Sequence, residues 1–339
     1  MYRKDVMNQI KTSNKNHAGK QVWKAMLKSL IDEKKDRHAK RDKTVSTRTR
    51  SNREDVLFQS FKELHELGYK INDPWNFREK HFEVLLKFWL EKGLSPSHIQ
   101  GKSSVLRTLC SWINKPGMIR TLEHYGAPKE RIKRVQVAQV DKSWSTNGVT
   151  FEDKFKEIEA HDMKLAAQLL MMSEFGLRRL EAICFRPLYA MKQGFESSSI
   201  VIDFGTKGGR PRVIPIDSDS KRDAIQYALS VSKGLHGSIG WDDKTLKQAA
   251  DYFSNTIRKF GLTKKELGVT SHGLRHQYLN DGYERITGHP SPVRGGEKGA
   301  VDPEVEIEAR TRMTLEAGHS RTSITPAYYG SHRKLTKHG

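Results

Sequence analysis

Helical periodicity broken by a single pair of β-branched runs is the feature that most limits the fold of this chain. The runs occupy positions 200–202 and 213–216, and the sequence Thr-Lys-Gly-Gly-Arg lies between them at 206–210. β-branched residues favour strands, and a glycine pair between two such runs favours a tight reversal. We therefore predict one β-hairpin, with basic residues at its tip, in a chain that is otherwise mainly helical.

A helical domain is predicted over residues 51–126. Its first apolar stripe consists of Leu57, Phe61 and Leu64. This spacing of three and four places one apolar face on a helix. Ser95 followed by Pro96 is a typical helix start, since serine caps the free amides and proline suits the first turn. Several short helices of this kind form a compact bundle of fewer than 100 residues.

The N-terminal 50 residues are predicted to form a basic, partly flexible arm. Residues 34–53 hold nine Lys and Arg but only two Asp, a composition typical of solvated tails and of segments that bind DNA phosphates. The whole chain has 60 Lys and Arg against 40 Asp and Glu, a formal charge of +20. Such a charge attracts polyanions, so nucleic acid or an anionic membrane surface is the expected partner.

Several classes of protein are not expected. No apolar run approaches the roughly 20 residues of a membrane-spanning helix, and the polar N-terminus does not indicate secretion. Two cysteines cannot form a disulfide framework or a cysteine-rich zinc site, and no histidine has metal-ligand spacing. We expect a cytoplasmic protein without metal, cofactor or membrane partner.

Residues 127–150 lack a sustained period and are predicted to form a linker, partly extended. The remainder, 151–339, is predicted to be one mixed α+β domain. Its helical segments flank the hairpin, and it holds one irregular Gly- and Pro-rich stretch at 288–299.

The second half of the chain holds a set of groups suited to phosphate chemistry. They are Arg178, Lys207, His272, Arg275, His319 and Tyr328. Two guanidiniums can clamp the oxygens of a phosphodiester as negative charge develops on them. A lysine or imidazole can move protons, and a tyrosine hydroxyl can form a covalent intermediate that conserves the bond energy for religation. This set needs neither a metal nor a nucleotide.

These residues lie in motifs that resemble those of the tyrosine recombinases, or phage-type integrases. The motifs are Gly176-Leu177-Arg178 with Glu181, Lys207 in Thr-Lys-Gly-Gly, His272-Gly273-Leu274-Arg275-His276, and Gly318-His319-Ser320 followed by Thr325 and Tyr328. All four occur in the family's order over about residues 150–330. The preceding helical segment is similar to the family's core-binding domain. The resemblance implies a helical SAM-like core-binding domain and a mixed α+β catalytic domain that close on DNA.

The resemblance also implies which side chains hold the phosphate. Arg178 and Arg275 would bind the scissile phosphate, and His319 would donate a hydrogen bond to one of its oxygens. Glu181 would orient its neighbours, as ligands of a reacting group need anchors of their own.

It further implies the groups that move protons and form the covalent bond. Lys207 would protonate the leaving 5′ oxygen, and His272 would act as general base or phosphate ligand. Tyr328 would become the 3′-phosphotyrosine.

Several of these roles have an alternative in the sequence. Arg179 neighbours Arg178, and both Arg210 and Arg212 lie near Lys207. Tyr329 is the rival nucleophile, although the nine-residue offset from His319 favours Tyr328. A further histidine of the third motif, His276, is expected to pack or to support its neighbours.

The chain departs from the family pattern in two places. Phe175 precedes Gly176 where the family often has threonine, and 43 residues separate Arg275 from His319, more than is usual. The stretch 288–299 is interpreted as an inserted loop whose role is open.

The expected function is site-specific DNA recombination, in particular integration and excision of a mobile element. Expected partners are double-stranded DNA with specific sites, three further copies of the chain in a homotetramer, and accessory DNA-bending proteins. Two alternatives stay open: a non-catalytic DNA-binding regulator of the same fold, and a DNA-relaxing enzyme similar to type IB topoisomerases.

Overall fold

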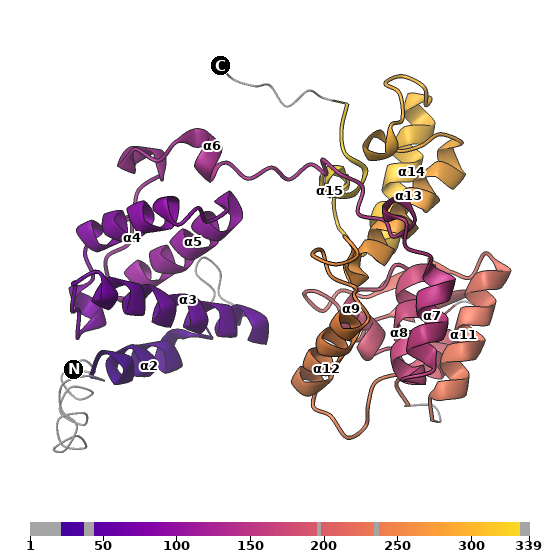
Figure 1. The fold of residues 1–339 in the computed structure, drawn as a ribbon, viewed down its shortest axis with the longest axis horizontal. Helices are drawn as coiled ribbons and strands as arrows, with labels where there is room; N and C mark the ends of the chain where they lie inside the picture. The colour runs from indigo at the N-terminus through magenta and orange to yellow at the C-terminus, as the bar shows by residue number, and fades with distance from the viewer. Residues whose placement is uncertain (1–21, 37–43, 195–197, 234–236, 333–339) are drawn as a thin grey trace. The chain divides into compact units, whose positions relative to one another are not determined.

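A computed structural model describes residues 22–36, 44–194, 198–233 and 237–332. The chain divides into two compact units, residues 1–134 and 135–339 (Figure 1). The predicted mainly helical fold with a small β element is confirmed. No helix within the described ranges is long and apolar enough to cross a membrane.

The first unit is a bundle of helices. Its elements are α2 (Val22–Lys34), α3 (Thr47–Glu66), η1 (Pro74–Asn76), α4 (Glu79–Glu91), α5 (Pro96–Trp112), η2 (Glu123–Tyr125) and α6 (Lys129–Ile132). The predicted cap at Ser95 is confirmed, since its hydroxyl accepts a hydrogen bond from the His98 amide. The core contains the fully buried Phe61 and Trp89. Trp89 donates its indole N–H to the buried carboxylate of Glu63, which also binds Lys102.

Part of the predicted basic arm is a core helix instead. Trp23, Leu27 and Leu30 of α2 are buried in the core of the first unit. Their three- and four-residue spacing gives this basic segment one apolar face, and burial of that face overrides the charge of the surrounding sequence. Residues 1–21 and 37–43 of the predicted arm lie outside the described residues.

The predicted linker 127–150 is shared between the two units. Residues 127–134 include α6, which packs against α5. Trp144 begins the second unit's core, where it is fully buried and donates its indole N–H to the carbonyl of Thr270 at 2.8 Å. Composition alone did not reveal these contacts because each depends on an element far away in sequence.

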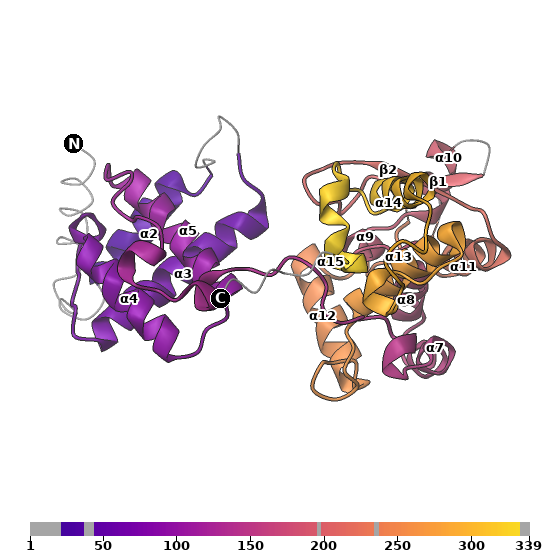
Figure 2. The ribbon, with the colours of Figure 1, turned by 90° about the horizontal axis from the view of Figure 1, so that it is seen from above.

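The second unit surrounds helix α8 (Met163–Glu174), which packs against α7 (Phe151–Glu159), α11 (Asp219–Val231) and α13 (Ser271–Thr287) (Figures 1 and 2). Its other elements are η3 (Ser145–Asn147), α9 (Arg179–Ile183), α10 (Pro187–Gln193), α12 (Leu246–Lys259), η4 (Pro292–Arg294), α14 (Pro303–Glu316), η5 (Thr322–Ile324) and α15 (Pro326–Tyr329). Helix α14 packs against α13, and α15 contacts both α13 and η4.

The predicted hairpin is confirmed. Strand β1 (Ser199–Ile202) pairs antiparallel with β2 (Arg212–Pro215), and Ile202 lies opposite Arg212. Gly208 and Gly209 both adopt positive φ, 80° and 67°, which glycine alone adopts without strain. The connection therefore reverses the chain and exposes Lys207.

Candidate active site

A sharp backbone turn positions Arg178. Gly176 has a φ of +58°, and a Cβ at this position would lie 2.5 Å from Cδ1 of Tyr278. Only glycine fits there, because any side chain would be strained and would collide with that ring. The turn delivers Arg178 to the N-cap of α9, where its side chain is only partly exposed.

A buried carboxylate anchors two arginines in the site. Glu181 is fully buried and accepts hydrogen bonds from Nη1 of Arg178 at 2.6 Å and from Nη1 and Nη2 of Arg212 at 2.9 and 2.7 Å. Burial by itself raises the pKa of this carboxyl, but the bonds and charges of Arg212 and Arg178 outweigh it and hold the pKa at about 2. Glu181 is therefore ionised and offsets part of the positive charge around it.

Arg275 is buried completely within α13. Its terminal nitrogens donate short hydrogen bonds to the carbonyls of Gly176 and Ala317. The same Ala317 carbonyl accepts from Nη2 of Arg178 at 2.8 Å. Burial, and to a smaller extent Arg178 and Arg212, lower the pKa of Arg275 to about 10, so it stays protonated at neutral pH. The two predicted phosphate-binding arginines thus meet at one carbonyl oxygen.

Tyr328 lies next to Arg275. Its hydroxyl is 3.2 Å from Nε2 of His319, a hydrogen bond in which either atom can donate. The guanidinium carbon of Arg275 lies 5.9 Å from the centre of the Tyr328 ring. The centre of the His276 ring lies 4.9 Å from the centre of the Tyr328 ring. Residues from α13, α14's C-terminal loop and α15 therefore converge around one phenol.

Tyr329, the rival nucleophile, faces the other way. It is 1% exposed and packs against Tyr283 in a tilted arrangement with ring centres 5.1 Å apart. Burial raises the pKa of its hydroxyl far above the usual range. The structure thus places Tyr328 next to the arginines and uses Tyr329 to anchor α15 in the core.

The remaining predicted site residues lie near the cluster but make fewer contacts. His272 lies in the first turn of α13, with the centre of its ring 5.1 Å from that of His276. Lys207 is exposed on the connection between β1 and β2. Its ammonium is close enough to contribute to the lowered pKa of His319.

The imidazoles are uncharged at neutral pH. Desolvation, together with the charges of Arg275 and Arg178, lowers the pKa of both His272 and His319 to about 4. The pKa of the buried His276 is lowered to about 3, chiefly by desolvation. A neutral imidazole can accept one proton while donating another, as proton transfer in the site requires.

The position of Arg212 was not predicted from the sequence, where this residue was only an alternative to Lys207. The structure buries Arg212 on the inward face of β2, next to Gly318, where a Cβ would lie 3.0 Å from its Cδ. The signal was the alternation of β2, since Ile214 two positions on is also buried. Among the described residues, no cluster of His, Cys, Asp or Glu has the arrangement of a metal site.

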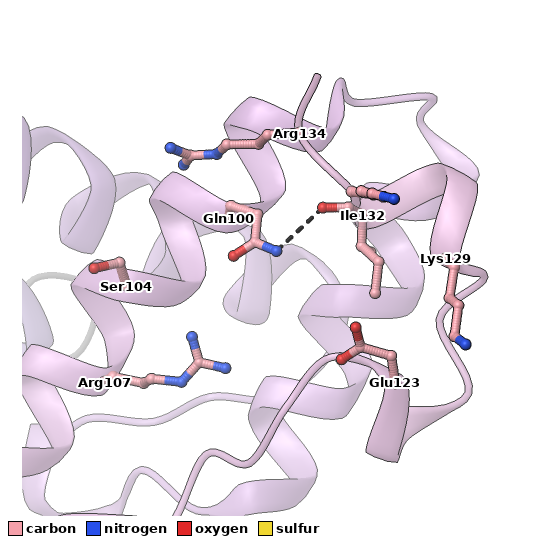
Figure 3. A pocket seen from close by; sticks show the side chains of 8 residues that line it. Gln100, Ser104, Arg107, Glu123, Lys129, Ile132 and Arg134 are labelled. Atoms are coloured by element: carbon pink, nitrogen blue, oxygen red, sulfur yellow. Dashed lines mark hydrogen bonds between the residues drawn. The ribbon is translucent and has the colours of Figure 1, made fainter. Parts of the chain in front are cut away.

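A second basic site lies in the first unit. A pocket of about 580 Å³ is lined by Gln100, Ser104, Arg107, Glu123, Lys129, Ile132, Lys133 and Arg134 (Figure 3). The amide of Gln100 donates to the carbonyl of Ile132 at 3.1 Å and so joins α5 to α6. Arg107 and Arg134 also donate to backbone carbonyls. The pocket is therefore a fixed frame that carries four cationic side chains.

Comparison with known proteins shows what this chain is similar to. A model of the integrase family matches residues 136–281, a range that includes Arg178, Lys207, His272 and Arg275 and ends before His319 and Tyr328. This match over residues 136–281 supports the resemblance to the tyrosine recombinases, or phage-type integrases, that the sequence motifs indicate. No curated protein matches it significantly.

Solved structures of low sequence identity share the fold. A lambda integrase dimer bound to a COC′ core site is 14% identical, with a TM-score of 0.55 over 91% of this chain and 98% of that chain. The Tn1549 transposon integrase in complex with transposon right end DNA is 15% identical, with a TM-score of 0.53 over 89% and 94%. The XerH recombinase bound to palindromic difH is 14% identical, with a TM-score of 0.50 over 92% and 81%.

The lowered histidine pKa values predict that acid destabilises the second unit. Between pH 6.5 and about 4 the unfolded chain binds protons that the native imidazoles do not, so the free energy of unfolding falls as pH falls through this window. His276→Gln should reduce this slope by up to about 1.4 kcal/mol per pH unit. The free energy of unfolding at each pH is measured by urea unfolding, followed by hydrogen exchange in α8 and α13.

The exposed His98 of the first unit supplies the control. His98→Gln should leave the pH dependence of α8 and α13 unchanged. Equal stability of the wild-type second unit at pH 7 and pH 4.5 would contradict the lowered pKa values.

Proposed function

We propose that this protein is a site-specific DNA recombinase that cuts and rejoins strands through a 3′-phosphotyrosine at Tyr328. The observation that carries this proposal is the position of the Tyr328 hydroxyl, 3.2 Å from His319 and beside the guanidinium of Arg275. A non-catalytic regulator has no need to hold a phenol against buried arginines.

The chemistry begins with phosphate binding. A phosphodiester oxygen would replace the Ala317 carbonyl as the partner of Arg178 and Arg275, because charged oxygens form the stronger bonds with guanidinium. Glu181 and Gly176 keep both side chains oriented before DNA arrives. This preorganisation stabilises charge that develops in the transition state.

Bond exchange then follows in a balanced step. The Tyr328 oxygen bonds to phosphorus while the bond to the 5′ oxygen breaks. The phenolic proton passes to a neutral imidazole, His272 in our assignment, and Lys207 gives a proton to the 5′ oxygen. His319 holds a phosphate oxygen. The reverse step, with a different 5′ hydroxyl as nucleophile, joins the new strand and frees the tyrosine.

The partner is double-stranded DNA bearing specific sites. The formal charge of +20 and the basic pocket of the first unit support binding to the phosphate backbone. We further propose that four copies act together on two sites, with DNA-bending proteins as accessory factors, and that the DNA exchanged belongs to a mobile element.

The proposal predicts opposite results for the two neighbouring tyrosines. On a duplex taken from the DNA that flanks the gene and nicked just 3′ of the scissile phosphate, the cut fragment diffuses away and the adduct accumulates. Tyr328→Phe should abolish the adduct with unchanged DNA affinity, because the Tyr328 hydroxyl is bonded to His319 beside Arg275, whereas Tyr329 is buried. Tyr329→Phe should retain it. Denaturing gels measure the adduct, and an adduct in Tyr328→Phe would contradict the assignment.

The role of Lys207 can be tested through the leaving group. Lys207→Ala should slow adduct formation by about 10²–10⁴-fold on ordinary DNA. A 5′-bridging sulfur should restore the rate, because a thiol pKa of about 8.5 lets sulfur leave without a proton. The matched control is Arg210→Ala, which removes another basic side chain of the same connection. This variant should form the adduct at the normal rate on ordinary DNA, without the 5′-bridging sulfur. A Lys207 variant equally slow on both substrates would contradict a general-acid role.

The pocket of the first unit predicts a change in salt dependence. Lys129→Ala with Lys133→Ala should lower the slope of log affinity against log salt by about 2, since each phosphate contact contributes about 0.9. Fluorescence anisotropy at roughly 50–200 mM salt measures it. Lys62→Ala, exposed on α3 outside the pocket, is the control. An unchanged slope in the double variant would exclude the pocket from the DNA interface.

A further inference from the structure

The stretch 288–299, whose role the sequence left open, packs against the tyrosine segment. It begins where α13 ends at Gly288, which has a φ of +70°, and it contains the short helix η4. Helix η4 contacts α15, the helix that carries Tyr328. The loop therefore belongs to the surroundings of the nucleophile.

Arg294 of η4 ties the loop to two other segments. Its Nε lies 3.0 Å from Oδ2 of Asp141, and its Nη2 donates to the hydroxyl of Ser143 at 2.9 Å. Its Nη1 lies 2.6 Å from Oδ1 of Asp281 on α13 and 3.5 Å from a carboxylate oxygen of Glu284. All three guanidinium nitrogens are thus used, and the single cation lies among three carboxylates.

Asp141 is a well-held partner for this cation. Its carboxylate is nearly buried and also accepts hydrogen bonds from the Ser143 hydroxyl at 2.7 Å and the Thr146 hydroxyl at 2.6 Å. Arg294 itself is 14% exposed. Ion pairs shielded in this way are weakened less by solvent than surface pairs, and loss of one partner leaves the other charge uncompensated.

A second chain of contacts joins the loop to Tyr328. The Ser291 hydroxyl donates to Oδ1 of Asn280 at 2.5 Å, and both residues are fully buried. The amide of Asn280 donates in turn to the carbonyl of Tyr328 at 3.4 Å and to that of His276 at 2.8 Å. The loop thus reaches the nucleophile through one side chain of α13.

The segment that enters the second unit completes the arrangement. The Ala138 amide donates to the carbonyl of Pro326 at 2.7 Å. Gly330, just after α15, is so close to this segment and to the loop that a Cβ would lie 3.1 Å from the Val293 amide and 3.3 Å from the Ala138 carbonyl. Helix α15 therefore lies against both the segment around Ala138 and the loop 288–299, and Arg294 joins that segment to the loop.

We propose that the loop 288–299 is an intramolecular latch and that Arg294 is its positioning residue. By joining residues 141–143 to α13 and η4, Arg294 keeps α15 docked in the site of its own subunit. Each copy then attacks DNA with its own Tyr328. This inference rests on the proposed function only for what Tyr328 does, because the docking itself is a property of the protein without DNA.

The docking is tested by hydrogen exchange on the full-length protein without DNA. In Arg294→Met the amides of residues 327–330 should exchange at least about tenfold faster, because their contacts open more often. Exchange in α8 should not change. Lys164→Met is the matched control, since Lys164 is similarly shielded and binds Gly240 and Asp242 elsewhere in the unit. Unchanged exchange at residues 327–330 in Arg294→Met would overturn the latch.

The effect on chemistry is tested with the nicked duplex under single-turnover conditions. Arg294→Met should form the adduct about 100-fold more slowly at unchanged DNA affinity, because small displacements of a nucleophile carry that cost. Arg294→Lys should restore part of the rate, since it keeps the charge between the carboxylates. Asp141→Asn with Arg294→Met should be no slower than Arg294→Met alone. Full activity of Arg294→Met, or losses that add in the double variant, would overturn the proposal.

The choice of subunit is tested by mixing two inactive proteins of different size. One carries Arg178→Gln and keeps its tyrosine, and the other carries Tyr328→Phe and keeps its arginines. The latch predicts no adduct in the mixture, and an adduct on the Arg178→Gln chain would overturn attack within one subunit. If wild type forms no adduct on any flanking duplex, the proposed function fails, whereas the exchange experiment still decides whether the latch exists.

Discussion

The candidate site depends on one buried carboxylate. Glu181 holds Arg178 and Arg212 through bonds of 2.6 to 2.9 Å, in a place that also contains the buried Arg275. Three guanidiniums brought together without an anion would repel one another in a poorly hydrated setting, where uncompensated charges are costly. The carboxylate therefore makes the cluster compatible with a folded protein, yet leaves a net positive site for a phosphate.

The same setting explains the state of the histidines. Desolvation and the neighbouring arginines lower the pKa values of His272, His276 and His319, so these side chains add no further charge at neutral pH. In the proposed reaction the arginines would thus supply the charge, and the imidazoles would supply hydrogen bonds and proton transfer. This division of roles follows from the ordinary pKa values of the two groups. Guanidinium has such a high pKa that it keeps its proton when desolvated, whereas the same desolvation removes the proton of imidazole.

The two adjacent tyrosines show what the local sequence can predict and what it cannot. Spacing from His319 favoured Tyr328, but the sequence alone left Tyr329 open. Helix α15 is a single turn, so neighbouring residues point in different directions, and the direction is set by burial of Tyr329 against Tyr283. That burial requires α13 and α14 as well as the loop that precedes α15. The tertiary structure therefore decided which of the two tyrosines lies in the candidate site.

Local chemistry accounts for much of this protein. The hairpin and the Ser95 cap follow from propensities that act within a few positions, and the residues proposed to bind phosphate lie in short sequence motifs. Packing between distant segments was needed to make 22–34 a core helix, to bring Arg212 to Glu181, and to join Arg294 to Asp141 across 153 positions of chain. These contacts are fixed by how whole helices pack against one another, and no local pattern in the sequence carries that information.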